Sequence, residues 1–169
     1  MLFRSGAQIW LEILAKRSDI CQYALVESAL TVPSKFTYAM IKPAFGSCYG
    51  LIKQKWFANL QFKSLNIKQE LFEDYYRDTC DISKSNMIAF LEANAMYGIK
   101  PSLDDSITKA YIFVGEKENK VMLKSAKIIQ RTLKDSTLEV LPELYHGEFS
   151  INKSREYANR IREIVGETL

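Results

Sequence analysis

The sequence is poor in the residues that build metal sites and disulfide frameworks. It has three cysteines and one histidine among 169 residues. Cys21, Cys48 and Cys80 are odd in number and none of them forms a C-x-x-C pair, so the sequence predicts neither a disulfide framework nor a zinc site. We therefore expect reduced thiols, no metal and no cofactor.

Signals for membranes and nucleic acids are also missing. A transmembrane helix needs about 18 or more consecutive apolar residues, and no such run occurs. The N-terminus shows no apolar core of a signal peptide. The net charge of +3 is mild and no dense block of Lys and Arg is present. We expect a cytoplasmic protein with neither a membrane nor a nucleic-acid partner.

Hydrophobic and helical patterns then point to an α/β protein with one compact core. Short apolar runs alternate with amphipathic stretches of helical period, an order that is typical of β-α-β units in a parallel sheet. Strands are predicted at residues 22–28, 110–114 and 137–141, and helices at 9–16, 121–133 and 151–165.

The segment between residues 33 and 105 has a different character. It is rich in aromatic residues, and we predict helices over residues 68–77 and 83–97, no strand, and a break in the first part at Pro43 and Gly46. The aromatics are explained most simply as packing within this segment, and the alternative is a lid over an apolar pocket. We predict a core of residues 1–32 and 106–169, interrupted by an all-helical cap insertion at 33–105.

Three features follow one another along the chain in the order of a candidate nucleophile, an acid and a histidine. A small-residue turn, Ser5-Gly6-Ala7-Gln8, opens a helix; Glu118 follows a strand; and His146 follows the next strand. An imidazole that takes a proton from a nucleophile needs a carboxylate to orient it. The simpler alternatives are that Glu118 only begins a helix, where an acid is favoured, and that His146 is a solvated loop residue.

Two motifs carry a resemblance to a known family. Val114-Gly115-Glu116-Lys117-Glu118 and Leu141-Pro142-Glu143-Leu144-Tyr145-His146-Gly147, in this order after the opening helix, resemble the C-terminal half of a capped α/β-hydrolase. The resemblance implies a partial α/β-hydrolase fold, with a short parallel sheet of three strands flanked by helices and interrupted by the cap. It implies Glu118 as the triad acid and His146 as the base, and it leaves Ser5 as the candidate nucleophile in one of two registers. Rival acids near the same loops are Glu116, Glu143 and Glu148.

The opening turn departs from the family motif Gly-x-Ser-x-Gly. If Gly6 is its last glycine, Arg4 stands at the nucleophile position and Leu2 at the first glycine. If Ser5 is the nucleophile, Phe3 and Ala7 stand at the small-residue positions. Two functions therefore stay open: a hydrolase of a small apolar ester, thioester or amide, and a non-catalytic remnant or binding module that keeps the cap pocket.

The resemblance also implies that part of the fold is missing. In the family, roughly five strands and an oxyanion-hole loop precede the nucleophile turn, so we expect a truncated fold that begins at that turn. The sheet edge at Gln22–Ser28 would then be bare, and a bare edge invites pairing. We expect either a homo-oligomer or association with a separately encoded N-terminal half through this edge.

Overall fold

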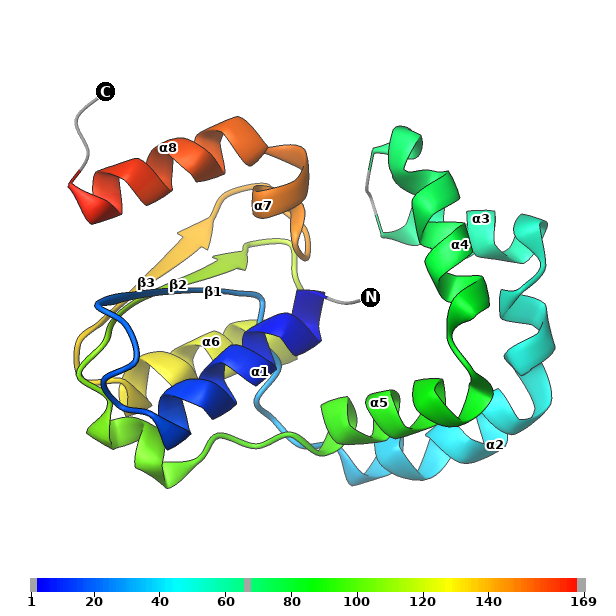
Figure 1. Cartoon of the computed structure of the whole chain (residues 1–169), viewed down its shortest axis with the longest axis horizontal. Helices are drawn as coiled ribbons and strands as arrows, with labels where there is room; N and C mark the ends of the chain where they lie inside the picture. Colours follow the sequence, from blue (N-terminus) through cyan, green and yellow to red (C-terminus); the bar gives the residue numbers. More distant parts are fainter. Residues whose placement is uncertain (1–2, 66–67, 167–169) are drawn as a thin grey trace. The chain divides into compact units, whose positions relative to one another are not determined.

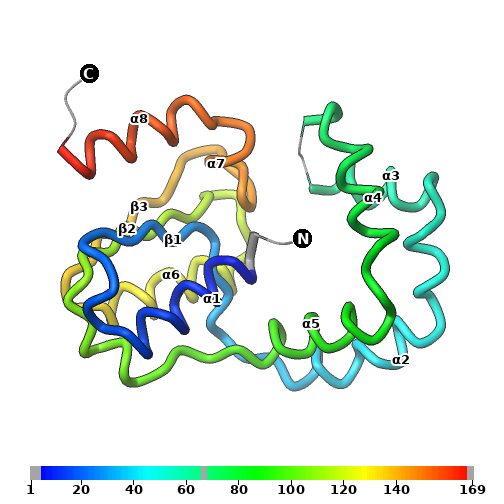
Figure 2. Tube along the Cα trace, in the orientation of Figure 1, coloured from blue at the N-terminus to red at the C-terminus, as the bar shows by residue number. Residues whose placement is uncertain are grey.

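The computed structural model describes residues 3–65 and 68–166. The chain forms two compact units: the residues up to Val32 together with those from Tyr97 onward, and Pro33–Met96. The trace leaves the first unit once, after Val32, and returns to it at Tyr97 (Figure 2).

The insertion is shorter than the sequence suggests, because its second boundary lies at Met96 rather than at residue 105. The short helix η2 (Pro101–Asp105) belongs to the first unit. Its Leu103 is buried in the main core, and the Ser102 hydroxyl donates a hydrogen bond of 2.9 Å to the Ala15 carbonyl.

The first unit is built on a parallel sheet, as predicted. Strands β1 (Tyr23–Glu27), β2 (Lys109–Gly115) and β3 (Ser136–Leu141) lie in the order β1-β2-β3. Val26 pairs with Ile112, and Ile112 with Leu138, so the carboxyl ends of all three strands meet at one end of the sheet. β1 forms one edge of the sheet among the described strands.

Helices cover both faces of this sheet (Figure 1). Helices α1 (Phe3–Lys16) and α6 (Lys120–Thr132) pack on one face, and α7 (Glu148–Asn152) and α8 (Ser154–Val165) on the other. Because side chains alternate along a strand, each strand supplies both cores. The core under α1 and α6 includes Ala24, Val26, Ala110, Ile112 and Val114. The core under α7 and α8 includes Phe113, Leu141 and Phe149.

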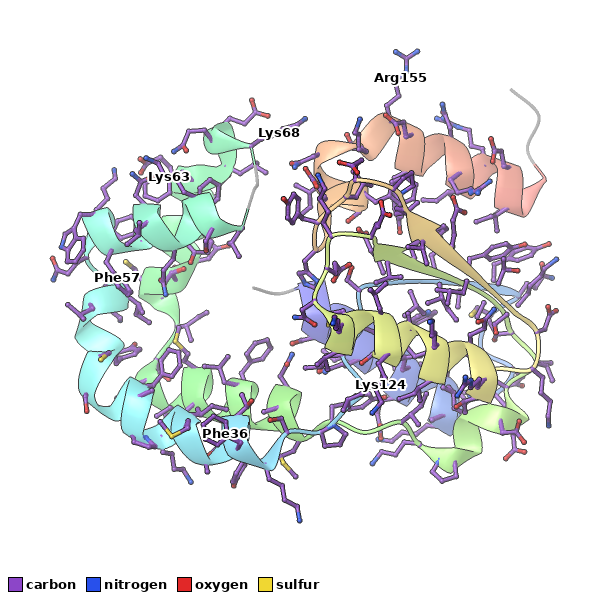
Figure 3. The ribbon with its side chains drawn as sticks, turned by 180° about the vertical axis from the view of Figure 1, so that it is seen from behind. Phe36, Phe57, Lys63, Lys68, Lys124 and Arg155 are labelled. Carbon is purple, nitrogen blue, oxygen red and sulfur yellow. The ribbon has the colours of Figure 1, made fainter. Side chains whose placement is uncertain are left out.

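The sequence of helix α6 explains where this helix begins and which of its faces is buried. Asn119 caps it, with its side-chain oxygen accepting from the Met122 N–H at 2.9 Å. An inward stripe at helical spacing is buried: Met122, Ala126, Ile129 and Leu133. The outer face is basic and exposed, with Lys120, Lys124, Lys127 and Arg131 (Figure 3 labels Lys124).

The second unit is helical over its described residues, with no strand among them. Its elements are α2 (Lys35–Ile52), α3 (Lys55–Ser64), η1 (Gln69–Leu71), α4 (Phe72–Asp81) and α5 (Lys84–Met96). Helix α2 packs against α5, and α3 against α4. The predicted break at Pro43 and Gly46 is wrong, because α2 runs through both and ends only at Ile52. The Ser34 side chain caps this helix by accepting from the Thr37 N–H at 3.2 Å.

Part of the aromatic content of the second unit is a local core. The Phe62 and Phe72 rings meet edge to face at 5.4 Å, and Phe62 also contacts Tyr75 at 5.2 Å. Phe36 of α2, by contrast, is 79% exposed (Figure 3). Among the described helices, none combines the length and the apolar character needed to cross a membrane.

Candidate active site

The carboxyl ends of the strands bring Glu118 and His146 into contact. Glu118 lies three residues beyond the end of β2, and its side chain is 1% exposed. Its Oε2 lies 2.7 Å from Nδ1 of His146, which follows β3 and whose side chain is 30% exposed. The structure therefore pairs the predicted acid with the predicted base and leaves the imidazole partly open to solvent.

Backbone hydrogen bonds fix the loop that carries His146. The Glu116 N–H donates to the Leu141 carbonyl at 2.9 Å, and the Lys117 N–H donates to the Leu144 carbonyl at 3.0 Å. Gly147 has a left-handed φ of 68°, which turns the chain from the loop into α7. The loop after β3 is thus held against the turn that carries Glu118.

Gly115 allows the two loops to approach this closely. A Cβ at this position would lie 2.2 Å from the Leu144 carbonyl oxygen and 2.8 Å from its carbonyl carbon. Both atoms are backbone and cannot swing away. Only glycine fits between β2 and the histidine loop in this arrangement.

Ser28 is a third member of the site that the sequence reasoning missed. It follows β1, is 3% exposed and has a left-handed φ of 53°, which is rare for a residue other than glycine. Its hydroxyl donates to Oε1 of Glu118 at 2.5 Å, and the Gly115 N–H donates to the same oxygen at 2.9 Å. The available signal was its place as the last residue of the predicted strand 22–28, whose neighbouring strands are followed by Glu118 and His146.

The contacts of Glu118 set its charge. Burial raises the pKa of the Glu118 carboxyl, but hydrogen bonds from His146, Ser28 and the Gly115 N–H outweigh that effect, so the pKa lies below its ordinary value of 4.5. An ionised carboxylate only accepts hydrogen bonds, so Nδ1 of His146 carries a proton. In the neutral imidazole Nε2 is then free of a proton and is the basic atom.

Ser5, the candidate nucleophile, lies within a helix. The predicted turn Ser5-Gly6-Ala7-Gln8 is wrong, because these residues already lie within α1, which begins at Phe3. Ser5 is 6% exposed, and α1 runs antiparallel to β1, so its first turn lies at the end of the sheet where the strands terminate (Figure 1). In the other register, Leu2 lies outside the described residues.

The rival acids contact other groups. Oε2 of Glu116 accepts from the Glu143 N–H at 3.1 Å, the Glu143 carboxylate pairs with Lys117 at 2.5 Å, and Oε2 of Glu148 accepts from the Tyr145 N–H at 2.8 Å. Among the acids near these loops, Glu118 is thus the one the described geometry pairs with His146. In the described part of the chain, no group of three His, Cys, Asp or Glu side chains could hold a metal ion.

Known structures share this architecture, although no model of a protein family and no curated protein matches the chain. An esterase from Exiguobacterium antarcticum superposes with a TM-score of 0.75 at 16% identity, over 97% of this chain and 65% of its own. A 2-hydroxy-6-oxo-6-phenylhexa-2,4-dienoate hydrolase from Rhodococcus sp. strain RHA1 gives 0.70 at 13%, over 94% and 60%. MGS-M2, an α/β-hydrolase enzyme from a Medee basin deep-sea metagenome library, gives 0.67 at 15%, over 97% and 63%.

These similarities define the class of fold. The chain has part of the α/β-hydrolase fold, with a three-stranded parallel sheet flanked by helices, as the sequence predicts. It spans less than two thirds of the length of the hydrolases that it matches.

Proposed function

We propose that this chain supplies the base and the orienting acid of a serine-hydrolase site that cleaves an ester, thioester or amide. The observation that carries the proposal is the 2.7 Å contact between Nδ1 of His146 and Oε2 of the buried Glu118. Its support is the place of this pair, just past the carboxyl ends of neighbouring parallel strands in a fold similar to that of esterases.

The chemistry follows from the protonation states. Nε2 of His146 takes the proton of an attacking hydroxyl, and the ionised Glu118 stabilises the imidazolium that forms. The proton returns from Nε2 to the leaving group. Ser28 and the Gly115 N–H hold Oε1 of the carboxylate, so that Oε2 keeps its direction toward the imidazole during the transfer.

A fluorophosphonate label and a p-nitrophenyl ester assay test this role. Both are applied to the full chain, alone and together with the segment of the Exiguobacterium antarcticum esterase that the chain does not match. We expect His146→Ala to abolish labelling, with Tyr145→Phe, a change in the neighbouring exposed residue, as the matched control. Loss in Ser5→Ala as well identifies Ser5 as the nucleophile. Labelling that survives Ser5→Ala and requires the added segment assigns the nucleophile to that segment.

The second candidate is a binding module without catalysis. It is favoured by the position of Ser5, which is buried within the first turn of a helix rather than exposed on a strained turn. An absence of labelling under both conditions, with the complex shown to form, would support this second function and reject the first. Labelling that survives His146→Ala also contradicts the proposal.

A further inference from the structure

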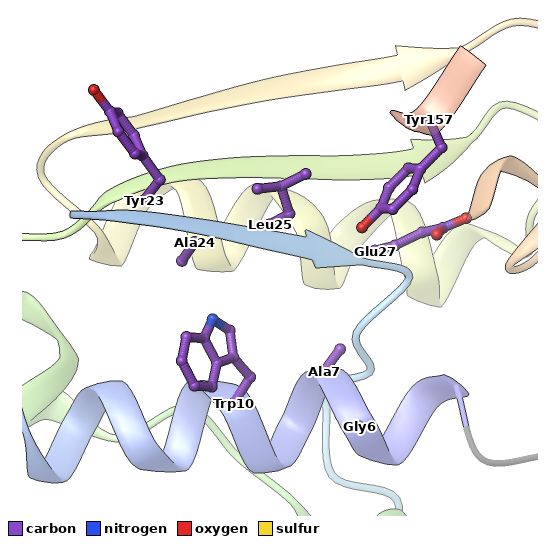
Figure 4. A pocket seen from close by; sticks show the side chains of 8 residues that line it. All are labelled: Gly6, Ala7, Trp10, Tyr23, Ala24, Leu25, Glu27 and Tyr157. Atoms are coloured by element: carbon purple, nitrogen blue, oxygen red, sulfur yellow. The ribbon is translucent and has the colours of Figure 1, made fainter. Parts of the chain in front are cut away.

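Glu27 is a partly buried acid that the proposed mechanism does not use. It is the last residue of β1. Because side chains alternate along a strand, Leu25 and Glu27 face the layer of α7 and α8, and Ala24 faces α1 (Figure 4). On this face Leu25 packs against an apolar core. Glu27 therefore places a carboxylate where the pattern of the strand favours an apolar side chain.

The carboxylate of Glu27 reaches the first turn of α7. Its Oε1 accepts from the Phe149 N–H at 3.2 Å and from the Ser150 N–H at 3.4 Å. The Ser150 side chain forms a further hydrogen bond with this carboxyl. The first amides of a helix have no acceptor within the helix, and Gly147, the residue before α7, has no side chain that could cap them. Glu27 supplies the missing acceptor from β1.

These contacts lie close to His146 along the chain. Helix α7 begins at Glu148, so His146 lies two residues before it. On the other side of His146, the Lys117 N–H donates to the Leu144 carbonyl at 3.0 Å and ties the loop to the turn after β2. His146 thus lies between two anchored segments, one held from β2 and one held from β1. Release of either segment would free the direction of the imidazole relative to Glu118.

The position of Glu27 costs free energy. The pKa of its carboxyl lies above the ordinary value of 4.5, because burial disfavours the charged form by more than the hydrogen bonds from Ser150 and Phe149 favour it. The negative charge of Glu118 adds a smaller effect in the same direction as burial. An apolar side chain would avoid this cost, but it could not bind the amides of α7.

We infer that Glu27 is a positioning residue of the candidate active site, whose carboxylate fixes the first turn of α7 and thereby directs the imidazole of His146 at Glu118. Phe149 is held at two points, since its N–H bonds to Glu27 and its ring packs on Phe113 at 5.3 Å. The importance of this role for catalysis rests on the proposed function, whereas the direction of the imidazole can be measured without it.

Three substitutions at Glu27 separate the reach of the side chain from its charge. Glu27→Gln keeps the length and an acceptor oxygen without the charge, Glu27→Asp keeps the charge but is shorter by one methylene group, and Glu27→Ala removes both. In the full chain, we expect the Phe149 and Ser150 amides to exchange about tenfold faster or more in the Asp and Ala variants. In Glu27→Gln these amides should stay close to the wild type.

The tautomer of His146 is the measurement that a mere helix cap would not change. In ¹⁵N-labelled full chain, the neutral imidazole of the wild type and of Glu27→Gln should carry its proton on Nδ1. Glu27→Asp and Glu27→Ala should give a mixture of the two tautomers. Glu139→Ala is the matched control, because Glu27 and Glu139 both pair with Phe113 across the sheet, and the Glu139 carboxylate contacts Arg160 of α8. It should keep the wild-type tautomer.

Several outcomes would overturn the inference. One is a wild-type tautomer in both Glu27→Asp and Glu27→Ala despite faster exchange in α7, which would make Glu27 a helix cap only. Others are a lost preference in Glu139→Ala, or a Glu27→Gln variant that is more disturbed than Glu27→Asp. If Glu27→Ala does not fold, the comparison of the Gln and Asp variants decides. Expected tautomer changes in a chain that takes no fluorophosphonate label, alone or with the added segment, would reject the proposed function and support the positioning role.

Discussion

At the scale of single residues, the carboxylate of Glu118 connects all three strand ends. It accepts from Ser28 after β1 and from Gly115 at the end of β2, and it contacts His146 after β3. Its side chain is 1% exposed, so water does not compete for these contacts. A buried carboxylate with three partners is costly to disturb, because each lost partner leaves charge less compensated.

The Ser28 hydroxyl should therefore stabilise the fold measurably. We expect Ser28→Ala to lower the free energy of unfolding by about 1.5–3 kcal/mol, the range for hydrogen bonds to charged groups. Ser28→Gly loses the same bond but relieves the left-handed φ of 53°, so it should be milder by about 1 kcal/mol. Urea unfolding monitored by circular dichroism measures both. Equal losses in the two variants would contradict the strain assigned to this position.

The lowered pKa of Glu118 predicts a specific pH dependence of stability. A carboxyl whose pKa is lower in the folded state binds fewer protons there than in the unfolded chain. Its stabilisation is therefore present above the unfolded pKa, near 4.5, and is lost as the pH falls through the folded value. The stability difference between the wild type and Glu118→Gln should be present above about pH 4.5 and shrink as the pH falls below about 4. A difference that is constant with pH would contradict the ionised state of Glu118.

The sequence could identify Glu118 and His146 but not Ser28. An acid and the single histidine of the chain follow successive predicted strands, and parallel strands end at the same side of a sheet. Ser28 ends a predicted strand, but a serine at a strand end is common and does not by itself indicate a site residue. Its role depends on a left-handed backbone and on burial, which neither hydrophobic period nor spacing reports.

At the scale of elements, Gly115 determines how closely the strand β2 and the histidine loop pack. Gly115→Ala would force the Leu144 backbone to move, and we expect it to cost about 1–3 kcal/mol and to displace His146. Gly50→Ala is the control, since a helical glycine with free space around it should gain about 0.5–1 kcal/mol. Thermal unfolding measures both. An unchanged or raised melting temperature for Gly115→Ala would contradict the close approach.

Helix α2 is expected to be weakened by its interior proline. Pro43 has no N–H, so the Ala39 carbonyl lacks its usual helical donor. Pro43→Ala restores that donor and should stabilise the second unit by about 2–3 kcal/mol without affecting the first. Hydrogen exchange resolved by segment would show slower exchange in α2 and α5 only. Faster exchange there would mean that the helix depends on the proline.

Two predictions of elements were wrong for related physical reasons. A proline and a glycine predict a break in α2, yet the helix continues through both, because tertiary packing against α5 outweighs their local cost. Ser5-Gly6-Ala7-Gln8 predicts a turn, yet glycine also tolerates helical dihedrals, and these residues belong to α1. Local sequence gives propensity, and packing decides the outcome.

At the scale of the whole molecule, the sequence predicted the α/β class and the parallel sheet from the alternation of apolar runs and amphipathic helices. This alternation predicts the fold class correctly because strands buried on both faces must be apolar and the helices that cover them must be amphipathic. The end of the insertion was misplaced because residues 97–105 look like a loop but pack against α1.

The proposed site depends most on the contact between His146 and Glu118, which can be measured directly in this chain. His146 is the sole histidine, so the imidazole nitrogens of a ¹⁵N-labelled sample need no assignment. We predict that the neutral imidazole of the wild type carries its proton on Nδ1, directed at Glu118, and that Glu118→Gln abolishes this preference. A wild-type ring protonated on Nε2, or the same tautomer balance in both proteins, would contradict the pairing on which the proposed site is built.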